Sequence, residues 1–179
     1  MLRILILSCL LLFISKDVHS QNLIKNASFK QQLEHWEYRA EVFDVVQNNL
    51  AFMSNHFFPF LFYTKYVSSY LKMGDNASIA QTVQTKVGEM YTVNIKLLNT
   101  QGLCMDINIY INGENVKQEN ICNSQIVDNY ISVDFLAEES NSLITIETQQ
   151  ISQNSTALCI TDVICTNKNT VSWEQYYKD

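Results

Sequence analysis

Apolar and polar residues alternate with a period of two along most of this chain, which is the pattern of half-buried β-strands. In residues 91–97, for example, Val93, Ile95 and Leu97 fall on one side of an extended chain. The other segments with this alternation, or with a short β-branched run, are 42–46, 79–83, 105–111, 131–135, 143–151 and 160–165. Helical periodicity is rare, so the pattern predicts an all-β fold.

Turn residues separate these segments at intervals of about 8–12 residues, which is typical of a sandwich or barrel. Examples are Gly74-Asp75-Asn76, Lys86-Val87-Gly88 and Asn112-Gly113, of which the last is a strong two-residue hairpin signal. No repeat, linker or charge block divides the chain. We predict one antiparallel β-sandwich domain, residues 21–166, followed by a polar tail, residues 167–179.

The first 20 residues have the features of a secretory signal peptide. Arg3 provides a positive start, residues 4–14 are apolar, and Val18-His19-Ser20 precedes the predicted cleavage site. The alternative is a membrane anchor, but the apolar run is shorter than the about 20 residues that span a bilayer. No later stretch is apolar enough to span either. We predict a secreted, extracellular protein without a transmembrane segment.

The mature chain is acidic, and its charges are dispersed. Removal of residues 1–20 takes two of 12 basic residues and one of 18 acidic residues, which leaves 10 minus 17, or −7. Nucleic acids and anionic membranes are bound by concentrated positive patches, and this chain has none. We therefore expect no nucleic-acid partner.

Three sequons for N-glycosylation follow the signal peptide, at Asn26, Asn76 and Asn154. In a secreted chain such sequons predict modification. Asn76 and Asn154 lie in polar stretches typical of exposed loops, whereas the exposure of Asn26 stays open.

Four cysteines remain after Cys9 leaves with the signal peptide, and in an oxidising compartment they allow three pairings. Pairing outward from Asn112-Gly113 sets Cys104 opposite Ile121 and next to Cys122. A Cys104–Cys122 disulfide across this hairpin therefore requires only a small slip or bulge, and it is the pairing that we predict.

Cys159 and Cys165 are harder to pair with each other. In one extended strand their Cα atoms would be about 20 Å apart, whereas a disulfide requires less than about 7 Å. Their pairing stays open, and an intermolecular bridge through either of them would link two chains.

Five motifs carry a family resemblance, because they occur in a fixed order along residues 22–166. Together they resemble the galactose-binding-like jelly-roll domains, and most closely the carbohydrate-binding modules that open with Asn-Leu-Ile-x-Asn-Gly-x-Phe-Glu and close with Ile-Asp-Asp-Val. The resemblance implies a jelly-roll topology and a glycan or glycoprotein partner. The motifs are Asn22-Leu-Ile-Lys-Asn-Ala-Ser-Phe29, Ala77-Ser-Ile-Ala-Gln-Thr-Val83, Gly88-Glu-Met-Tyr-Thr-Val-Asn-Ile95, Asn129-Tyr-Ile-Ser-Val-Asp-Phe-Leu-Ala137 and Ile160-Thr-Asp-Val-Ile164.

The resembling modules often hold a calcium ion through the Glu after the first-strand Phe and an Asp of the closing strand. Lys30 and Asp162 occupy these positions here. Because an ammonium group cannot coordinate a cation, we predict no strong metal site and no cofactor, with a Lys30–Asp162 salt bridge as the alternative brace.

Signatures of catalysis are lacking in the sequence. The two histidines of the mature chain, His35 and His56, have no metal-ligand spacing with another His or Cys. Neither a Gly-x-Ser-x-Gly elbow nor a Gly-rich phosphate loop occurs. Glu138 and Glu139 are adjacent, so in a strand they would face opposite ways. We predict a protein that is not an enzyme.

Residues 57–66 contain six aromatic side chains in ten positions and the chain's only proline, Pro59, which disfavours a central strand there. Aromatic rings stack on the apolar C–H faces of sugars, while polar neighbours bind the hydroxyl groups. There are two alternatives to sugar binding by these residues. They could have a structural role, or they could form an exposed patch that contacts lipid or protein. The predicted ligand-binding residues are Phe57, Phe58, Phe60 and Tyr63.

Trp36 and Tyr38 are the second group of ligand-binding candidates. In the resembling modules a tryptophan at the position of Trp36 packs the edge of the sandwich, so a core role is the preferred interpretation of Trp36. The sequence thus predicts a non-catalytic protein that binds carbohydrate or glycoconjugate. The alternative is an adhesion or signalling protein that binds a protein partner through the same surface.

Overall fold

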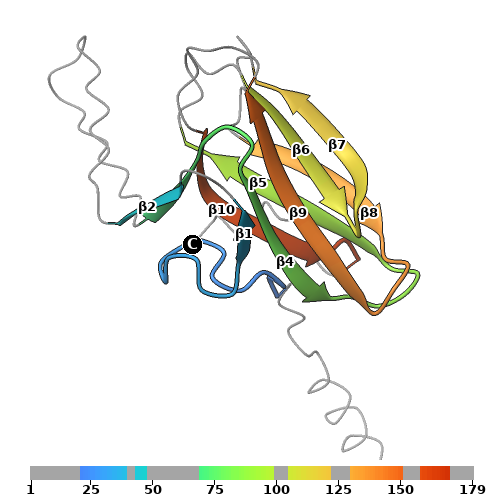
Figure 1. The fold of residues 1–179 in the computed structure, drawn as a ribbon. Helices are drawn as coiled ribbons and strands as arrows, with labels where there is room; N and C mark the ends of the chain where they lie inside the picture. Colours follow the sequence, from blue (N-terminus) through green and yellow to red (C-terminus); the bar gives the residue numbers. More distant parts are fainter. Residues whose placement is uncertain are drawn as a thin grey trace, which may run out of the picture.

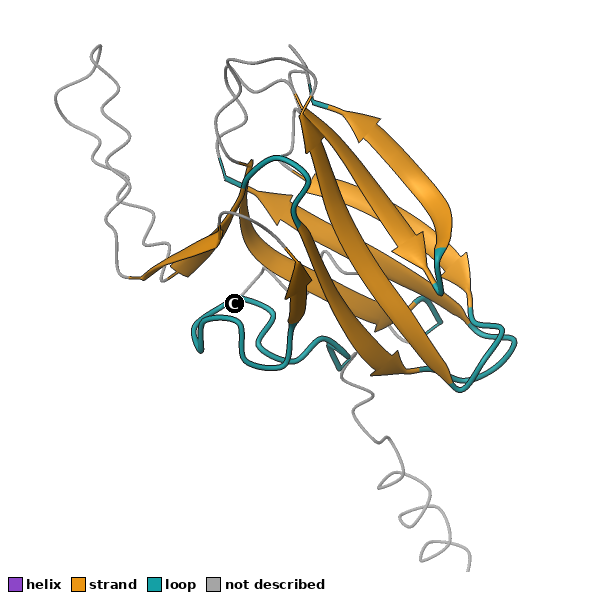
Figure 2. Cartoon of the chain, viewed as in Figure 1, coloured by secondary structure: helices purple, strands orange, loops and turns teal. Residues whose placement is uncertain are grey.

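The structure, a computed structural model, describes residues 21–39, 43–47, 69–98, 105–121, 130–150 and 158–169. The regular elements of these residues are all strands (Figures 1 and 2). The strands are β1 (Glu37–Arg39), β2 (Phe43–Gln47), β3 (Ser69–Met73), β4 (Ser78–Gln84), β5 (Met90–Leu97), β6 (Met105–Ile111), β7 (Glu114–Asn120), β8 (Tyr130–Leu136), β9 (Asn141–Gln150) and β10 (Leu158–Asn167).

The strands form two antiparallel five-stranded sheets packed face to face. Sheet A has the order β1-β4-β9-β6-β7, and sheet B has the order β2-β3-β10-β5-β8. In Figure 1, β4, β9, β6 and β7 lie in front of β10, β5 and β8. Of the connections between consecutive strands, only β2–β3 and β6–β7 stay within one sheet, so most neighbours in a sheet are distant in sequence. The predicted jelly-roll β-sandwich is confirmed.

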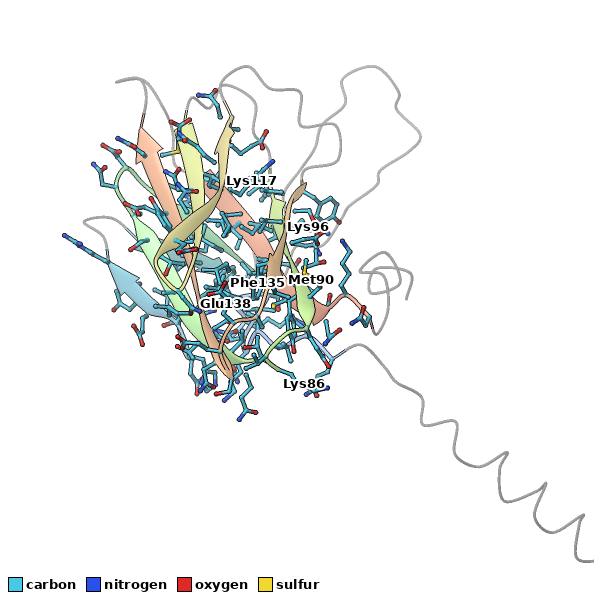
Figure 3. The ribbon with its side chains drawn as sticks, turned by 90° about the vertical axis from the view of Figure 1, so that its right-hand side faces the viewer. Lys86, Met90, Lys96, Lys117, Phe135 and Glu138 are labelled. Carbon is cyan, nitrogen blue, oxygen red and sulfur yellow. The ribbon has the colours of Figure 1, made fainter. Side chains whose placement is uncertain are left out.

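The alternation of the sequence decides which side chains fill the space between the sheets. In β8, Ile131, Val133 and Phe135 are buried while Ser132 and Asp134 are exposed. Figure 3 shows Phe135 among the side chains between the sheets, where its ring stacks on Tyr91 of β5 with centroids 5.6 Å apart. Each large apolar side chain buried in this way contributes roughly 1.5–3 kcal/mol to the stability of the sandwich.

The hairpin predicted at Asn112-Gly113 joins β6 to β7. Both turn residues have positive φ, 52° and 87°, as a type I′ turn requires. The pairing starts at Ile111 with Glu114, but Ile109 lies opposite Lys117, so Val116 is an extra residue that forms a bulge. Beyond this bulge the register is shifted by one position relative to the pairing predicted from the turn.

A second bulge, at Thr161, reverses which residues of β10 face the core. Ile160 pairs with Leu97 and Asp162 with Lys96, so Thr161 has no partner in the register. Before the bulge the even-numbered Ile160 faces inward, and after it the odd-numbered Val163 and Cys165 do. Cys159 and Cys165 therefore lie on opposite faces of one strand, and they form no disulfide with each other.

The buried position of Cys165 also bears on the predicted intermolecular bridge. Cys165 is 0% exposed, so its thiol cannot meet a thiol of another chain in the folded state. Burial raises the pKa of Cys165 to about 12 and also raises the pKa of the half-buried Cys159. An intermolecular disulfide through Cys165 is inconsistent with this structure, and no disulfide is present at Cys159.

The N-terminal segment takes the place of a strand beside β10. Strand β3 pairs with β10 only at residues 158–160. Further along, Leu23 N donates to Cys165 O at 2.9 Å, and Val163 N donates to Ala27 O at 3.0 Å. The segment then turns inward, and the ring of Phe29 is fully buried between the sheets. The first and last sequence motifs are thus neighbours in space.

We predict that Phe29→Ala lowers the free energy of unfolding by about 3–5 kcal/mol, because it leaves a cavity in the core. Leu136, which is 52% exposed on β8, provides the control, since Leu136→Ala should change stability by no more than about 0.5 kcal/mol. Urea titration of both variants gives the two values. Equal values would mean that Phe29 does not anchor the N-terminal segment.

The disulfide predicted between Cys104 and Cys122 stays a prediction, because both residues lie outside the described ranges. The last described pair of this hairpin is Met105 with Ile121, whose N donates to Met105 O at 2.9 Å, and Cys104 and Cys122 are the next residues in the sequence. We expect a non-reduced digest to yield a peptide linked through these two residues, and native alkylation to leave Cys165 unmodified. A linkage between Cys159 and Cys165 would contradict the observed strand.

Candidate functional site

Of the residues predicted to bind ligand, the structure describes Trp36 and Tyr38. Phe57, Phe58, Phe60 and Tyr63 lie outside the described residues, as does Asn154. Trp36 is 6% exposed and packs on Phe29 with ring centroids 5.6 Å apart, whereas Tyr38 in β1 is 61% exposed. Trp36 therefore lies in the core, which was its preferred interpretation. A buried ring cannot stack on a sugar, so of these two residues only Tyr38 can contact a ligand.

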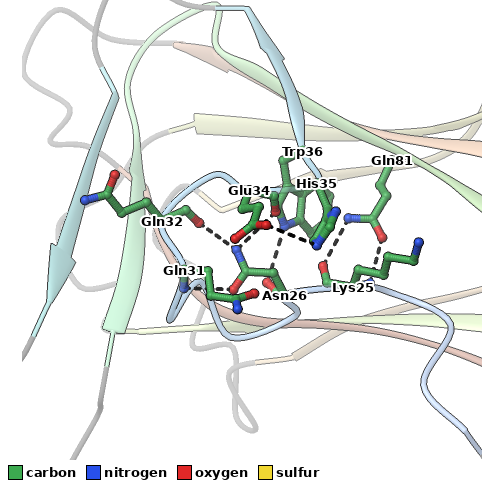
Figure 4. Close-up of polar contacts among 8 residues, drawn as sticks. All are labelled: Lys25, Asn26, Gln31, Gln32, Glu34, His35, Trp36 and Gln81. Carbon is green, nitrogen blue, oxygen red and sulfur yellow. Dashed lines mark hydrogen bonds and ion pairs between the residues drawn. The ribbon is translucent and has the colours of Figure 1, made fainter.

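A series of turns holds Trp36 in place, and Asn26 is at its centre (Figure 4). The side-chain amide of Asn26 donates to Gln32 O at 2.9 Å and to Glu34 O at 3.2 Å, while its oxygen accepts from Gln31 N at 3.1 Å. The indole N–H of Trp36 donates to Asn26 O at 3.3 Å. Both N–H groups of the Asn26 side chain therefore donate to backbone carbonyls within residues 26–36.

Gln81 fixes the same segment to sheet A. Its side chain is 5% exposed and makes two hydrogen bonds with the backbone of Lys25, accepting from N at 2.7 Å and donating to O at 3.1 Å (Figure 4). This imitates the pairing of a neighbouring strand. The turn segment is consequently a rigid support that places β1 at the edge of the sheet.

The surface best suited to ligand contact is the outer face of sheet A over β6, β7 and β9, which we call the polar face. Outward residues of these strands pair across the sheet in register, for example Gln118 with Asn108 and Asn108 with Glu147. The polar face consists of Asp106, Asn108, Tyr110, Asn115, Gln118, Asn120, Thr145, Glu147 and Gln149.

Hydrogen bonds between β6 and β7 orient the amides of the polar face. Asp106 accepts from Gln118 at 3.1 Å and from Asn120 at 2.9 Å, one bond at each carboxylate oxygen. Asn115 donates to Asn108 at 3.3 Å. Gln118, Asn120 and Asn115 are exposed, so their side chains are accessible from solvent. Fixed amides of this kind can bind pairs of adjacent hydroxyl groups.

Tyr110 adds an aromatic ring to this surface. It is half-buried on β6 and lies between Asn115 of β7 and Thr145 of β9 in the register. Its neighbours carry hydroxyl, amide and carboxylate groups. The polar face thus combines hydrogen-bonding side chains with part of one aromatic ring, whereas acid–base or nucleophilic chemistry has no evident arrangement here.

Two kinds of feature are missing from the described ranges. There, no group of three His, Cys, Asp or Glu side chains could hold an ion, and no helix is long and apolar enough to cross a bilayer. His35 is exposed in the turn segment, 3.7 Å from a carboxylate oxygen of Glu34. Lys30, at the position where the resembling modules have a calcium ligand, is exposed.

The polar face was not predicted from the sequence. Strand β7 has no apolar alternation, so hydrophobic periodicity does not mark it. A usable signal was present nevertheless. Asp106, Asn108 and Tyr110 alternate with buried isoleucines, and the Asn112-Gly113 hairpin places the polar residues of β7 beside them.

Comparison with known proteins supports the fold. No family model matches the sequence, and neither does any curated protein. Among solved structures, TmCBM61 in complex with β-1,4-galactotriose has a TM-score of 0.55 and 12% identity, over 83% of this chain and 100% of that one. The enzymatically active domain of bacteriophage CBA120 tailspike protein 4 has a TM-score of 0.52 and 15% identity, over 82% of this chain and 21% of that one. At such identities the likeness shows a shared jelly-roll fold.

We predict that Asn76 carries an N-linked glycan in protein from a eukaryotic secretory host and that Asn26 does not. Asn76 is exposed in the turn between β3 and β4. A glycan on Asn26 would replace one of the N–H groups that bond Gln32 and Glu34. Enzymatic deglycosylation in heavy-oxygen water followed by peptide mapping reports the occupancy of each site. High occupancy of Asn26 in folded protein would show that its hydrogen bonds are dispensable.

Proposed function

We propose that this chain is a secreted, non-catalytic carbohydrate-binding protein that binds a neutral glycan on the polar face of sheet A. The observation that carries the proposal is the set of amides held by Asp106 and Asn108. Gln118, Asn120 and Asn115 are oriented before a ligand arrives, so binding does not have to pay the full entropy of ordering them.

The chemistry of the polar face matches that of a sugar. Each pyranose presents adjacent hydroxyl groups that donate and accept, and a side-chain amide has both a donor and an acceptor. Tyr110 can contact the apolar C–H face of a ring. Specificity in such a site arises because a missing hydroxyl group would leave a polar side chain without its partner.

The charge of the protein favours neutral over acidic glycans. The predicted mature chain has a net charge of −7, from 10 basic and 17 acidic residues, and the polar face contains the carboxylates of Asp106 and Glu147. Uronic acids or sulfated sugars would be repelled by these groups. A polysaccharide or glycoprotein glycan of neutral hexoses avoids this cost.

The jelly-roll fold is compatible with this role, since TmCBM61 is described in complex with a galactotriose. Fold alone does not determine function, so the proposal rests on the polar face. The predicted aromatic residues Phe57, Phe58, Phe60 and Tyr63, together with Tyr38, remain candidates for additional contacts. The same aromatic residues would mediate the alternative function, binding of a protein partner.

We expect the secreted protein to bind neutral oligosaccharides saturably on a glycan array. The variant Gln118→Ala/Asn120→Ala should weaken binding by about tenfold, since each lost hydrogen bond is worth roughly 0.5–1.5 kcal/mol. Gln31→Ala is the matched control, because Gln31 is exposed in the turn segment and far from β7 in sequence. Titration calorimetry with the best array ligand measures the three affinities.

Two results would revise the proposal in different ways. If the change of Phe57, Phe58 and Phe60 to alanine abolishes binding while the amide variant binds normally, the glycan site lies at the aromatic segment. If folded protein binds no glycan on the array, carbohydrate binding is rejected, and the protein-partner alternative would be tested by affinity capture.

A further inference from the structure

The two carboxylates of the polar face differ in how their oxygens are used. Asp106 on β6 accepts from Gln118 at one oxygen and from Asn120 at the other. Glu147 on β9 is half-buried, and within the described ranges no hydrogen bond or ion pair joins its carboxylate to another residue. The oxygens of Asp106 therefore orient neighbouring amides, whereas those of Glu147 can accept from a ligand.

Asn108 on β6 places a donor beside this second carboxylate. It is 7% exposed and pairs with Glu147 in the register, so the two Cβ atoms lie about 5 Å apart. The oxygen of Asn108 accepts from Asn115 at 3.3 Å, but its side-chain nitrogen donates to no residue that the structure describes. Polar groups this deep in a protein normally have a partner. A ligand oxygen that accepts from Asn108 would supply one and would also lie within reach of Glu147.

Half-buried residues with hydroxyl groups, one of them aromatic, surround this pair. Ser78 of β4 flanks Glu147 on its other side. Thr145, two positions before Glu147 on β9, lies beside Tyr110 of β6. In the described part of the chain, none of these three side chains has a hydrogen bond or ion pair. Two positions along a strand are about 7 Å, and the step to the next strand is about 5 Å. The cluster therefore covers an area comparable to one sugar ring with its hydroxyl groups.

A carboxylate whose two oxygens are both accessible favours one arrangement of hydroxyl groups. Its oxygens can accept from two donors side by side, as they accept from the paired N–H groups of an arginine. Hydroxyl groups on adjacent carbons of a sugar ring present two O–H donors in this way, and one of their oxygens can in turn accept from Asn108. Hydrogen bonds to a charged group are about twice as strong as those between neutral groups. Glu147 should therefore dominate the choice of ligand.

We propose that Glu147 and Asn108 select neutral glycans in which each internal sugar keeps two adjacent hydroxyl groups, and that Glu147 accepts from both of them. This inference rests on the proposed function and names the class of glycan. Hexopyranoses joined through 1,4 links keep the hydroxyl groups O2 and O3, which are adjacent. Those joined through 1,3 links keep O2 and O4, which are separated by the carbon that carries the link. The polar face is therefore specific for 1,4-linked over 1,3-linked chains.

Matched polysaccharides test this choice on the parent protein. The probes are soluble glucan, galactan and mannan, each as a 1,4-linked and a 1,3-linked chain. Each 1,4-linked chain is also tested after periodate oxidation, which cleaves the bond between carbons with adjacent hydroxyl groups, and reduction of the resulting aldehydes. We expect at least one 1,4-linked chain to bind about tenfold or more tightly than its 1,3-linked counterpart. Periodate should abolish that binding.

A pair of charge-neutralising variants tests the role of Glu147. Glu147→Gln keeps the size of the side chain, and we expect it to weaken binding of the preferred 1,4-linked chain by about tenfold or more. Glu138→Gln is the matched control, because it removes the same charge from an exposed residue of the β8–β9 turn (Figure 3). It should bind as the parent protein does. Thermal unfolding of both variants checks that they are folded, and the periodate comparison needs no variant.

The outcomes separate this inference from the proposed function. Equal binding of 1,4-linked and 1,3-linked chains, binding that survives periodate, or unchanged binding by folded Glu147→Gln would overturn the inference and leave glycan binding standing. No binding to any polysaccharide or array glycan would overturn both. Tighter binding of an amino-sugar polysaccharide that salt abolishes would also overturn the inference, because Glu147 would then pair with an ammonium group.

Discussion

The pairing of the N-terminal segment with β10 is the interaction on which the rest of the structure depends. Strand β3 covers only the first part of β10, so the backbone of residues 163–165 would otherwise lack partners on one side. Asn22 solves part of this by accepting from Cys165 N at 2.9 Å, while Leu23 and Ala27 bond the backbone on either side of it. Unpaired backbone groups at this depth would be costly. Closure of the sandwich therefore requires residues from both ends of the domain.

That closure also determines where the turn segment can go. Once residues 22–27 are fixed to β10, Phe29 enters the core and Trp36 packs on it. Asn26 has φ 50° and Phe29 has φ 54°, conformations that side chains other than glycine adopt at a cost. Hydrogen bonds of Asn26 and Gln81 offset this cost. The consequence is a rigid edge that positions β1, and with it the exposed Tyr38.

The two outer faces of the sandwich differ in chemistry because different strands meet on them. On sheet A, the β6–β7 hairpin places exposed amides beside Asp106 and Asn108, and hydrogen bonds orient these amides. On sheet B, small polar residues of β5 and β10 are buried. A preorganised, solvated polar surface is suited to ligands rich in hydroxyl groups, whereas buried residues are not accessible to a ligand. This contrast is the physical basis for assigning ligand binding to sheet A.

The sequence by itself determined the fold class, the strands with alternating side chains and the turn at Asn112-Gly113, because these depend on local geometry and on the burial of one strand face. It could not determine which alternate residues of a strand face the core once a bulge has inserted an extra residue. One extra residue, Thr161, moves Cys165 into the core while Cys159 faces outward, and Val116 shifts the β6–β7 register by one. Thr161 lies where β10 pairs with β5, a strand distant in sequence, and Val116 lies in β7, which has no apolar alternation, so no local pattern marks either bulge. The polar face was likewise decided only by tertiary structure, since it depends on residues brought together from separate strands.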